Sequence, residues 1–165
     1  AKITGTRSNY SRELMINKGS KESVLPGQFV LSERKDAIVG VVSESSETAA
    51  KVRLITDTMQ TLEIYIRRNG TDSEIRAMMV GNGTETCSIS MIDQQQDIRE
   101  GDVVYAAAVP DKLNIPLVVG EITSVYPDDQ HPLLWKITVR PVEDMSRLNN
   151  VAIIVADERL LKRKD

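Results

Sequence analysis

The side chains that most often catalyse reactions are rare in this chain. Histidine occurs once, as His131, and no serine lies in a G-x-S-x-G elbow. Hydrolysis by a Ser/His/Asp triad needs a serine held beside a histidine base. His131 lies between Gln130 and Pro132, in a pattern typical of a loop. We therefore expect an exposed loop histidine, and a double-barrel hydrolase without a recognisable triad is kept as the alternative function.

Other reactive or metal-binding groups are equally sparse. Cys87 is the only cysteine, and it alternates in phase with Ile89 and Met91, so all three are expected to point inward on a strand. One cysteine and one histidine are too few for a zinc site built from these two residue types, and the acidic pair Asp128 and Asp129 lacks the spacing of a calcium loop. No glycines form a phosphate-binding loop. We predict no catalytic residue, no cofactor and no metal.

Composition narrows the class of protein. The 165 residues carry a net charge of −3, with 41% hydrophobic, 27% charged and 4% aromatic residues. These values fit a globular protein and argue against a nucleic-acid binder, which is usually basic and uses aromatic rings to stack on bases. No apolar run approaches the ~18 residues of a membrane span, and no signal peptide is present. Because the chain starts with alanine inside a strand-like pattern, we expect a fragment or a processed chain.

Alternating hydrophobicity predicts strands throughout. Leu62–Arg68 is the clearest strand, and residues 1–6 form a shorter one broken by a glycine. The Asn82-Gly83 pair predicts a hairpin between strands near 74–80 and 86–92. About twelve short strands are expected, and no segment has sustained helical periodicity. The sequence therefore predicts an all-β sandwich or barrel with very little helix.

Three short strings recur in the same order in the two halves. The longer spacing in the second half falls in loop-like segments, as a duplicated fold unit would tolerate. The matched strings are Gly27–Val30 with Gly101–Val104, Val39–Val42 with Val119–Ile122, and Lys51–Leu54 with Lys136–Val139.

The repeat predicts two six-stranded units, each closing as a small barrel of the chymotrypsin-like, Greek-key type. The units span residues 1–70 and 71–157, and residues 158–165 form a charged tail. Closure is favoured because it removes free strand edges. The pattern leaves open whether the units are contiguous or exchange a strand.

The two longer loops of the second unit, 106–116 and 126–135, carry apolar residues. They either cap a barrel end or form an exposed patch for a partner. The candidate docking residues are Val109, Leu113, Ile115, Leu133, Leu134 and Trp135.

An ordered set of strings resembles a known family. The strings lie at Ile16–Lys21, Pro26–Gln28, Val39–Val42, Val52–Asp57, Ile98–Val104, Val118–Ile122, Leu134–Pro141 and Asp144–Leu148. Together they resemble the extracytoplasmic core of the bacterial rod shape-determining protein MreC. The resemblance covers about residues 1–156, and its specificity comes from the order of the strings rather than from any single one.

The resemblance implies a non-enzymatic scaffold of the cell-elongation (peptidoglycan synthesis) machinery. It implies two β-barrels outside the bacterial cytoplasmic membrane, with a transmembrane helix and a coiled coil before Ala1. The implied partners are MreD, the actin-like MreB, RodZ and an elongation penicillin-binding transpeptidase. Self-association as a dimer or filament is also implied. The family has no catalytic residues that could be carried over.

Overall fold

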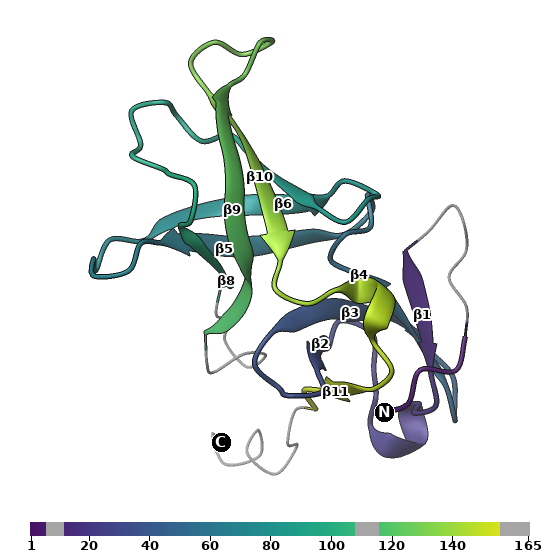
Figure 1. Ribbon diagram of the computed structural model, residues 1–165. Helices are drawn as coiled ribbons and strands as arrows, with labels where there is room; N and C mark the ends of the chain where they lie inside the picture. Colours follow the sequence, from purple (N-terminus) through teal and green to yellow (C-terminus); the bar gives the residue numbers. More distant parts are fainter. Residues whose placement is uncertain (6–11, 108–115, 156–165) are drawn as a thin grey trace, which may run out of the picture.

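Two β-sheets make up residues 1–5, 12–107 and 116–155, which the computed structural model describes (Figure 1). Two short 3₁₀ turns, η1 (Ser20–Glu22) and η2 (Met145–Arg147), are the only helical elements in those ranges, so the predicted all-β class is confirmed. The strands are β1 (Glu13–Ile16), β2 (Phe29–Ser32), β3 (Ile38–Ser45), β4 (Ala50–Leu54), β5 (Thr61–Arg67), β6 (Ile75–Gly81), β7 (Cys87–Ser90), β8 (Val103–Ala106), β9 (Leu117–Pro127), β10 (Trp135–Pro141) and β11 (Val151–Ile153).

Six strands form a closed barrel in the order β10-β7-β6-β5-β8-β9. Every strand has two partners, so the barrel has no free edge. The predicted Asn82-Gly83 hairpin is confirmed, since β6 and β7 pair from Met78 with Ser90 to Gly81 with Cys87. The barrel interior is filled by β-branched and other apolar side chains that alternate along each strand. Among the most buried are Ile64, Met79, Ile89, Ile122 and Ile137.

The expected inward position of Met91 is wrong. Cys87 and Ile89 are buried as predicted, whereas Met91 is 79% exposed. The strand ends at Ser90, and Met91 takes a φ of 64°. This left-handed conformation breaks the two-residue alternation, so the side chain turns out to solvent.

The other sheet has five strands in the order β1-β4-β3-β2-β11, where a second closed six-stranded barrel was expected. Residues 1–4 lie between its two edge strands. On one side Thr4 N–H donates to the Met15 carbonyl at 2.8 Å, and on the other Ile3 N–H donates to the Asn149 carbonyl at 3.0 Å. The segment makes isolated bridges rather than a ladder, because a bend at Gly5 ends it after four residues. It occupies the place of a sixth strand without completing one.

The internal repeat is visible in the backbone. Gly27 and Gly101 both have a φ of 90°, a value that disfavours other residues. Gly27 N–H donates to the Val42 carbonyl, and Gly101 N–H donates to the Ile122 carbonyl, each at 2.8 Å. The register of each following strand pair shifts at the same place, after Val30 in β2 and after Val104 in β8. The two halves therefore share their turn and their bulge.

The third pair of matched strings needs a correction of two residues. Val42 pairs with Val52, and its counterpart Ile122 pairs with Val139 rather than with Ile137. The true match is therefore Val52-Arg53-Leu54 with Val139-Arg140-Pro141. Period-two alternation hides a shift of two, because the shift keeps every side chain on the same face.

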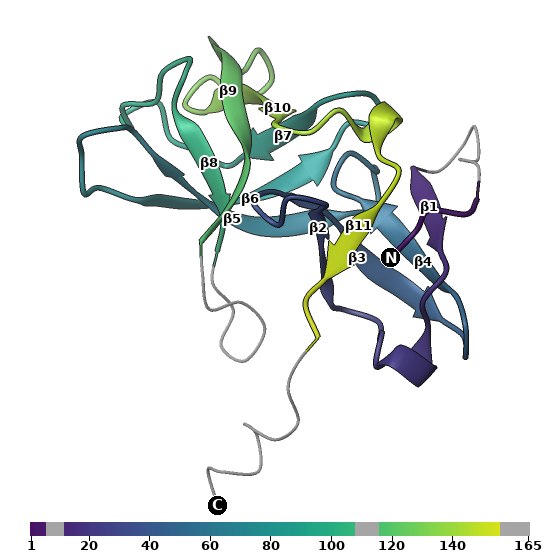
Figure 2. The ribbon, with the colours of Figure 1, turned by 60° about the horizontal axis from the view of Figure 1, so that its bottom comes forward.

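Sheet membership does not follow the expected boundary at residue 70. β5 pairs with β6 and β8 in the barrel, and β11 pairs with β2 in the five-stranded sheet, where Figure 2 shows it in yellow. Each half thus supplies its last strand to the other sheet. Both strands follow a turn closed by an aspartate. The Asp57 carboxylate accepts from Met59 N–H at 2.7 Å, and the Asp144 carboxylate accepts from Ser146 N–H at 2.9 Å.

Candidate protein-interaction surface

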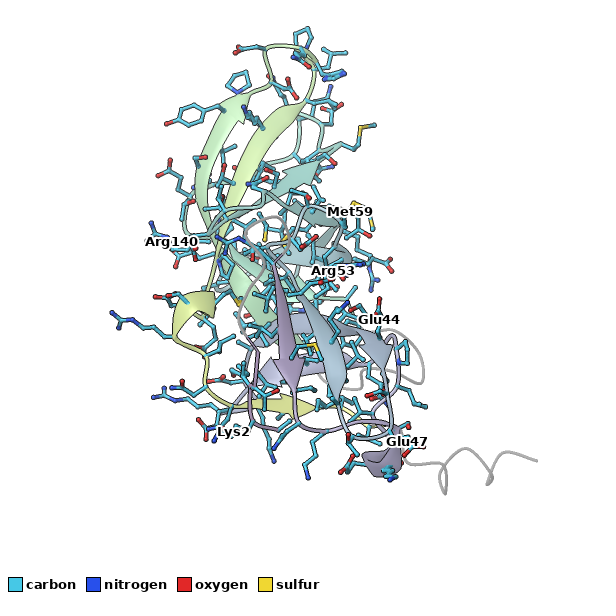
Figure 3. The ribbon with its side chains drawn as sticks, turned by 90° about the vertical axis from the view of Figure 1, so that its right-hand side faces the viewer. Lys2, Glu44, Glu47, Arg53, Met59 and Arg140 are labelled. Atoms are coloured by element: carbon cyan, nitrogen blue, oxygen red, sulfur yellow. The ribbon has the colours of Figure 1, made fainter. Side chains whose placement is uncertain are left out.

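Three connections lie at one end of the barrel, and we call them the loop end. They are residues 68–74 between β5 and β6, 91–102 between β7 and β8, and 128–134 between β9 and β10. The β9–β10 hairpin projects from the barrel away from the five-stranded sheet (Figures 1 and 3). Adjacent antiparallel strands place all three connections at this same end.

The residues that lead into β10 at the tip of the β9–β10 hairpin are hydrogen-bonded to the β7–β8 connection. Trp135 N–H donates to the Ile92 carbonyl at 2.8 Å, and Gln94 N–H donates to the Leu133 carbonyl at 2.9 Å. The Gln94 side-chain amide donates to the Pro132 and Leu134 carbonyls at 2.9 and 3.0 Å. The hairpin tip is therefore held in a defined position relative to the rest of the loop end.

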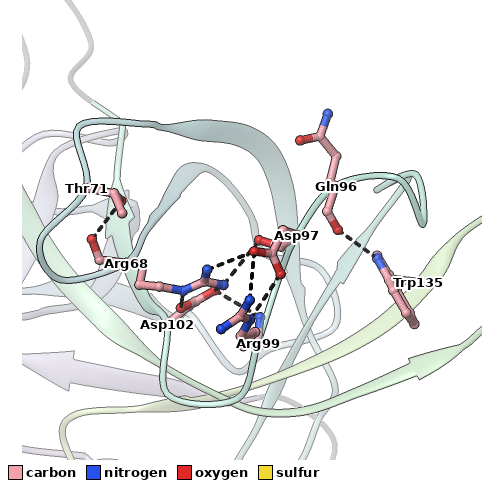
Figure 4. Close-up of polar contacts among 7 residues, drawn as sticks. All are labelled: Arg68, Thr71, Gln96, Asp97, Arg99, Asp102 and Trp135. Carbon is pink, nitrogen blue, oxygen red and sulfur yellow. Dashed lines mark hydrogen bonds and ion pairs between the residues drawn. The ribbon is translucent and has the colours of Figure 1, made fainter.

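The predicted docking residues have different surroundings. Leu133 is 77% exposed, while Leu134 and Trp135 are half-buried. The Trp135 indole Nε1–H donates to the Gln96 carbonyl at 3.2 Å, and the ring packs against the barrel core (Figure 4). Of the three, only Leu133 offers most of its side chain to a partner.

The other three predicted residues, Val109, Leu113 and Ile115, lie outside the described residues. Ala106 and Leu117, which flank that segment, pair with each other where β8 ends and β9 begins. This position is at the opposite end of the barrel from Leu133.

Sequence reasoning missed two exposed apolar side chains at or beside the loop end. Met91 is 79% exposed, and Tyr126, near the end of β9, is 62% exposed. Tyr126 also lines a shallow cleft of about 450 Å³ on the outside of the hairpin, together with Lys136 and Asp129. Tyr126 belongs to segment 126–135, one of the two places where the second half of the repeat is longer than the first. Nothing in the local sequence distinguishes Met91.

A charged network links two of the connections and was not expected from the sequence (Figure 4). Arg68 binds both carboxylate oxygens of Asp102, at 2.9 and 3.1 Å, and the carboxylate of Asp97 at 3.0 Å. Arg99 also binds Asp97, at 3.1 and 3.2 Å. Hydrogen bonds from Arg68 and then Arg99 lower the pKa of the Asp97 carboxyl below its usual range.

His131 is an exposed loop histidine, as expected. Its Nδ1 lies 3.5 Å from the carboxylate of Asp128, three residues earlier in the same turn, and its side chain is 65% exposed. The backbone N–H of Gln130, followed by that of His131, lowers the pKa of the Asp128 carboxyl. Within the described ranges, no serine forms a hydrogen bond with His131. The histidine and the aspartate therefore belong to the same turn.

Cys87 is buried, and its thiol lies 3.3 Å from the Ile55 carbonyl. Burial raises the pKa of this thiol to about 12. At pH 8 only ~1 thiol in 10⁴ would be ionised, and the thiolate is the reactive form.

We expect a thiol-alkylating reagent to leave Cys87 of the folded protein unmodified at pH 8 and to modify it in full once urea unfolds the protein, as measured by mass spectrometry. Rapid modification of the folded protein would contradict this.

The comparisons with known proteins agree with this architecture. The model of the family "Rod shape-determining protein MreC, barrel core" matches residues 3–155. The chain belongs to the MreC family. The relatives it matches in this family carry the name cell shape-determining protein MreC. It is 29% identical to that of Escherichia coli K12 over 158 residues, covering 95% of this chain and 41% of the relative. It is 25% identical to that of Bacillus subtilis over 162 residues, covering 94% and 55%.

Solved MreC structures share the fold. A crystal structure of MreC from Pseudomonas aeruginosa superposes with a TM-score of 0.79 at 26% identity, covering 93% of this chain and 96% of that one. MreC in a complex with the penicillin-binding protein PBP2 of Helicobacter pylori superposes at 0.65 with 12% identity, covering 94% of each chain, and shows the fold alone. The chain spans about half the length of the E. coli and B. subtilis relatives.

Within residues 1–5, 12–107 and 116–155, no helix has the length and hydrophobicity needed to cross a membrane. In the same ranges, no three side chains among His, Cys, Asp and Glu are grouped closely enough to hold a metal ion.

Proposed function

We propose that this chain is a non-enzymatic scaffold module of the bacterial cell-elongation machinery, which directs peptidoglycan synthesis. It acts by protein–protein interaction on the outer side of the cytoplasmic membrane. The observation that carries the proposal is the loop end, where hydrogen bonds hold a projecting hairpin and Leu133 is 77% exposed at its tip. Met91 and Tyr126 are also exposed at or beside this end, and exposed apolar side chains gathered in one region are typical of a docking site.

A penicillin-binding transpeptidase is the proposed partner at the loop end. The MreC of Helicobacter pylori was solved in a complex with PBP2, and its fold is that of this chain. MreD, MreB, RodZ, self-association and a membrane helix preceding this segment belong to the same proposal, and membership of the family supports them.

Leu133→Asp tests the proposed docking site. We expect the affinity for the cognate elongation transpeptidase to fall about tenfold or more, because a charge replaces an apolar contact that would be desolvated on binding. Isothermal titration calorimetry measures the effect. The matched control is Leu25→Asp, since Leu25 is 49% exposed and precedes β2 of the five-stranded sheet. It should bind within about twofold of the unsubstituted chain. Equal affinities for both variants would refute the proposed site.

Trp135→Ala distinguishes the two roles left open for the apolar loop residues. The substitution removes the indole hydrogen bond to Gln96 and the packing of the ring on the core. If Trp135 only caps the barrel, the free energy of unfolding falls and the transpeptidase affinity stays unchanged. If it contributes to docking, the affinity falls in the folded variant as well.

A further inference from the structure

Arg68 connects parts of the barrel that come from different halves of the repeat. It follows β5, the strand that the first half supplies to the barrel, and it binds a carboxylate of the second half. The Asp102 side chain is only 6% exposed, and both of its oxygens accept from the Arg68 guanidinium at 2.9 and 3.1 Å. A bidentate pair on a buried carboxylate fixes both distance and angle.

Comparison of the two halves of the repeat separates the closure of the turn before β8 from the contact that Arg68 makes there. In the first half the position equivalent to Asp102 is Gln28, whose side-chain oxygen accepts from Leu25 N–H at 3.0 Å. In the second half Asp102 accepts from Arg99 N–H at 2.9 Å in the same way. A neutral amide therefore closes the same turn without any arginine. The turn can therefore close without the bond to Arg68. That bond instead links the β7–β8 connection to the end of β5.

Further hydrogen bonds connect Arg68 and the β7–β8 connection to the exposed β9–β10 hairpin. Arg68 also donates to the Asp97 carbonyl at 3.3 Å, and the adjacent Gln96 carbonyl accepts from the Trp135 indole at 3.2 Å. Two residues earlier, Gln94 donates to the carbonyls on either side of Leu133. Arg68 thus holds one part of the β7–β8 connection, and Gln94 and Gln96 of that connection hold the tip of the β9–β10 hairpin (Figure 4).

We propose that Arg68 is a positioning residue for the loop end. It fixes the β7–β8 connection from the exchanged strand, and through it the hairpin that carries Leu133. The inference rests on the proposed function, because it assigns the regulation of the same docking site to the first half of the chain. Arg99 is a matched control, since its guanidinium binds the same Asp97 carboxylate, only its backbone N–H donates to Asp102, and its side chain is 67% exposed.

The experiment compares Arg68→Ala, Arg99→Ala and the double variant Arg68→Ala with Asp102→Gln. Glutamine supplies the neutral closure seen at Gln28, so the double variant repairs the turn without restoring the link. Three measurements are made: affinity for the transpeptidase, the NMR resonance of the Trp135 indole N–H, and thermal unfolding. We expect Arg68→Ala to lose about tenfold in affinity and to shift the indole resonance. Arg99→Ala should change the affinity by less than about twofold.

The double variant decides between positioning and simple turn stability. We expect it to regain thermal stability while its affinity stays low and its indole resonance stays displaced. The proposal is overturned if the double variant regains affinity for the transpeptidase. It is also overturned if Arg68→Ala binds the transpeptidase as tightly as the unsubstituted chain does. If the unsubstituted chain does not bind, the proposed function fails, and an unchanged indole resonance in Arg68→Ala then overturns the inference separately. If Arg68→Ala does not fold, Arg68→Lys retains the charge without the bidentate geometry and should still shift the indole resonance.

Discussion

Gly120→Ala is expected to lower the free energy of unfolding by about 3 kcal/mol or more, and it has the largest effect predicted here. A Cβ at this position would lie 2.1 Å from the Arg140 carbonyl oxygen and 2.8 Å from its carbon. Both atoms are backbone atoms of β10, so no side-chain rotation relieves the overlap. The pairing of β9 with β10 must shift, and the hairpin that carries Leu133 depends on that pairing.

Urea unfolding followed by circular dichroism measures this effect. The repeat supplies a second case, since a Cβ at Gly40 would lie 2.5 Å from the Arg53 carbonyl oxygen. The control is Gly70→Ala in the β5–β6 connection, where a Cβ would meet no atom within 4 Å. Because Gly70 has a φ of 83°, this variant should still lose about 1 kcal/mol. If Gly120→Ala unfolds at the same urea concentration as Gly70→Ala, the overlap with the Arg140 backbone is not what destabilises the protein.

Asp57→Ala is expected to lower the free energy of unfolding by about 2 kcal/mol. The Asp57 side chain is buried at the turn from β4 to the exchanged strand β5, and its two oxygens accept from Arg12 N–H and Met59 N–H, each at 2.7 Å. Alanine leaves two partly buried backbone donors without this acceptor, and each unsatisfied donor costs about 1 kcal/mol, at the low end of the range for buried groups. Asp57→Asn retains one carbonyl acceptor and should lose about half as much.

Asp144→Ala is the matched control for Asp57→Ala. Asp144 stands at the equivalent turn before β11 and accepts from Ser146 N–H, but it is exposed, so water can replace the lost acceptor. We expect a smaller loss than for Asp57→Ala when the free energy of unfolding of both variants is measured by urea unfolding followed by circular dichroism. A larger loss from Asp144→Ala would show that burial of the Asp57 carboxylate is not what makes its turn important.

Local patterns predicted the elements of the fold but only part of the candidate site. The alternation in Leu62–Arg68 and the Asn82-Gly83 turn identified β5 and the β6–β7 hairpin, since both depend on neighbouring residues. The lengthened loop identified Leu133, which is exposed. The Arg68–Asp102 pair was not predictable, because one scattered arginine and one turn aspartate carry no signal until a strand brings them together.

What the sequence determined by itself is the all-β class and the duplication, including the paired glycines Gly27 and Gly101 that share a φ of 90°. These follow from short-range sterics, which act within a few residues. Only the tertiary structure decided that β5 and β11 change sheets and that residues 1–4 lie between β1 and β11. Each depends on hydrogen bonds between segments far apart in the chain, and the same alternating pattern satisfies either partner. Long-range pairing of β5 within the barrel therefore determined that the first half of the chain contributes Arg68 to the loop end.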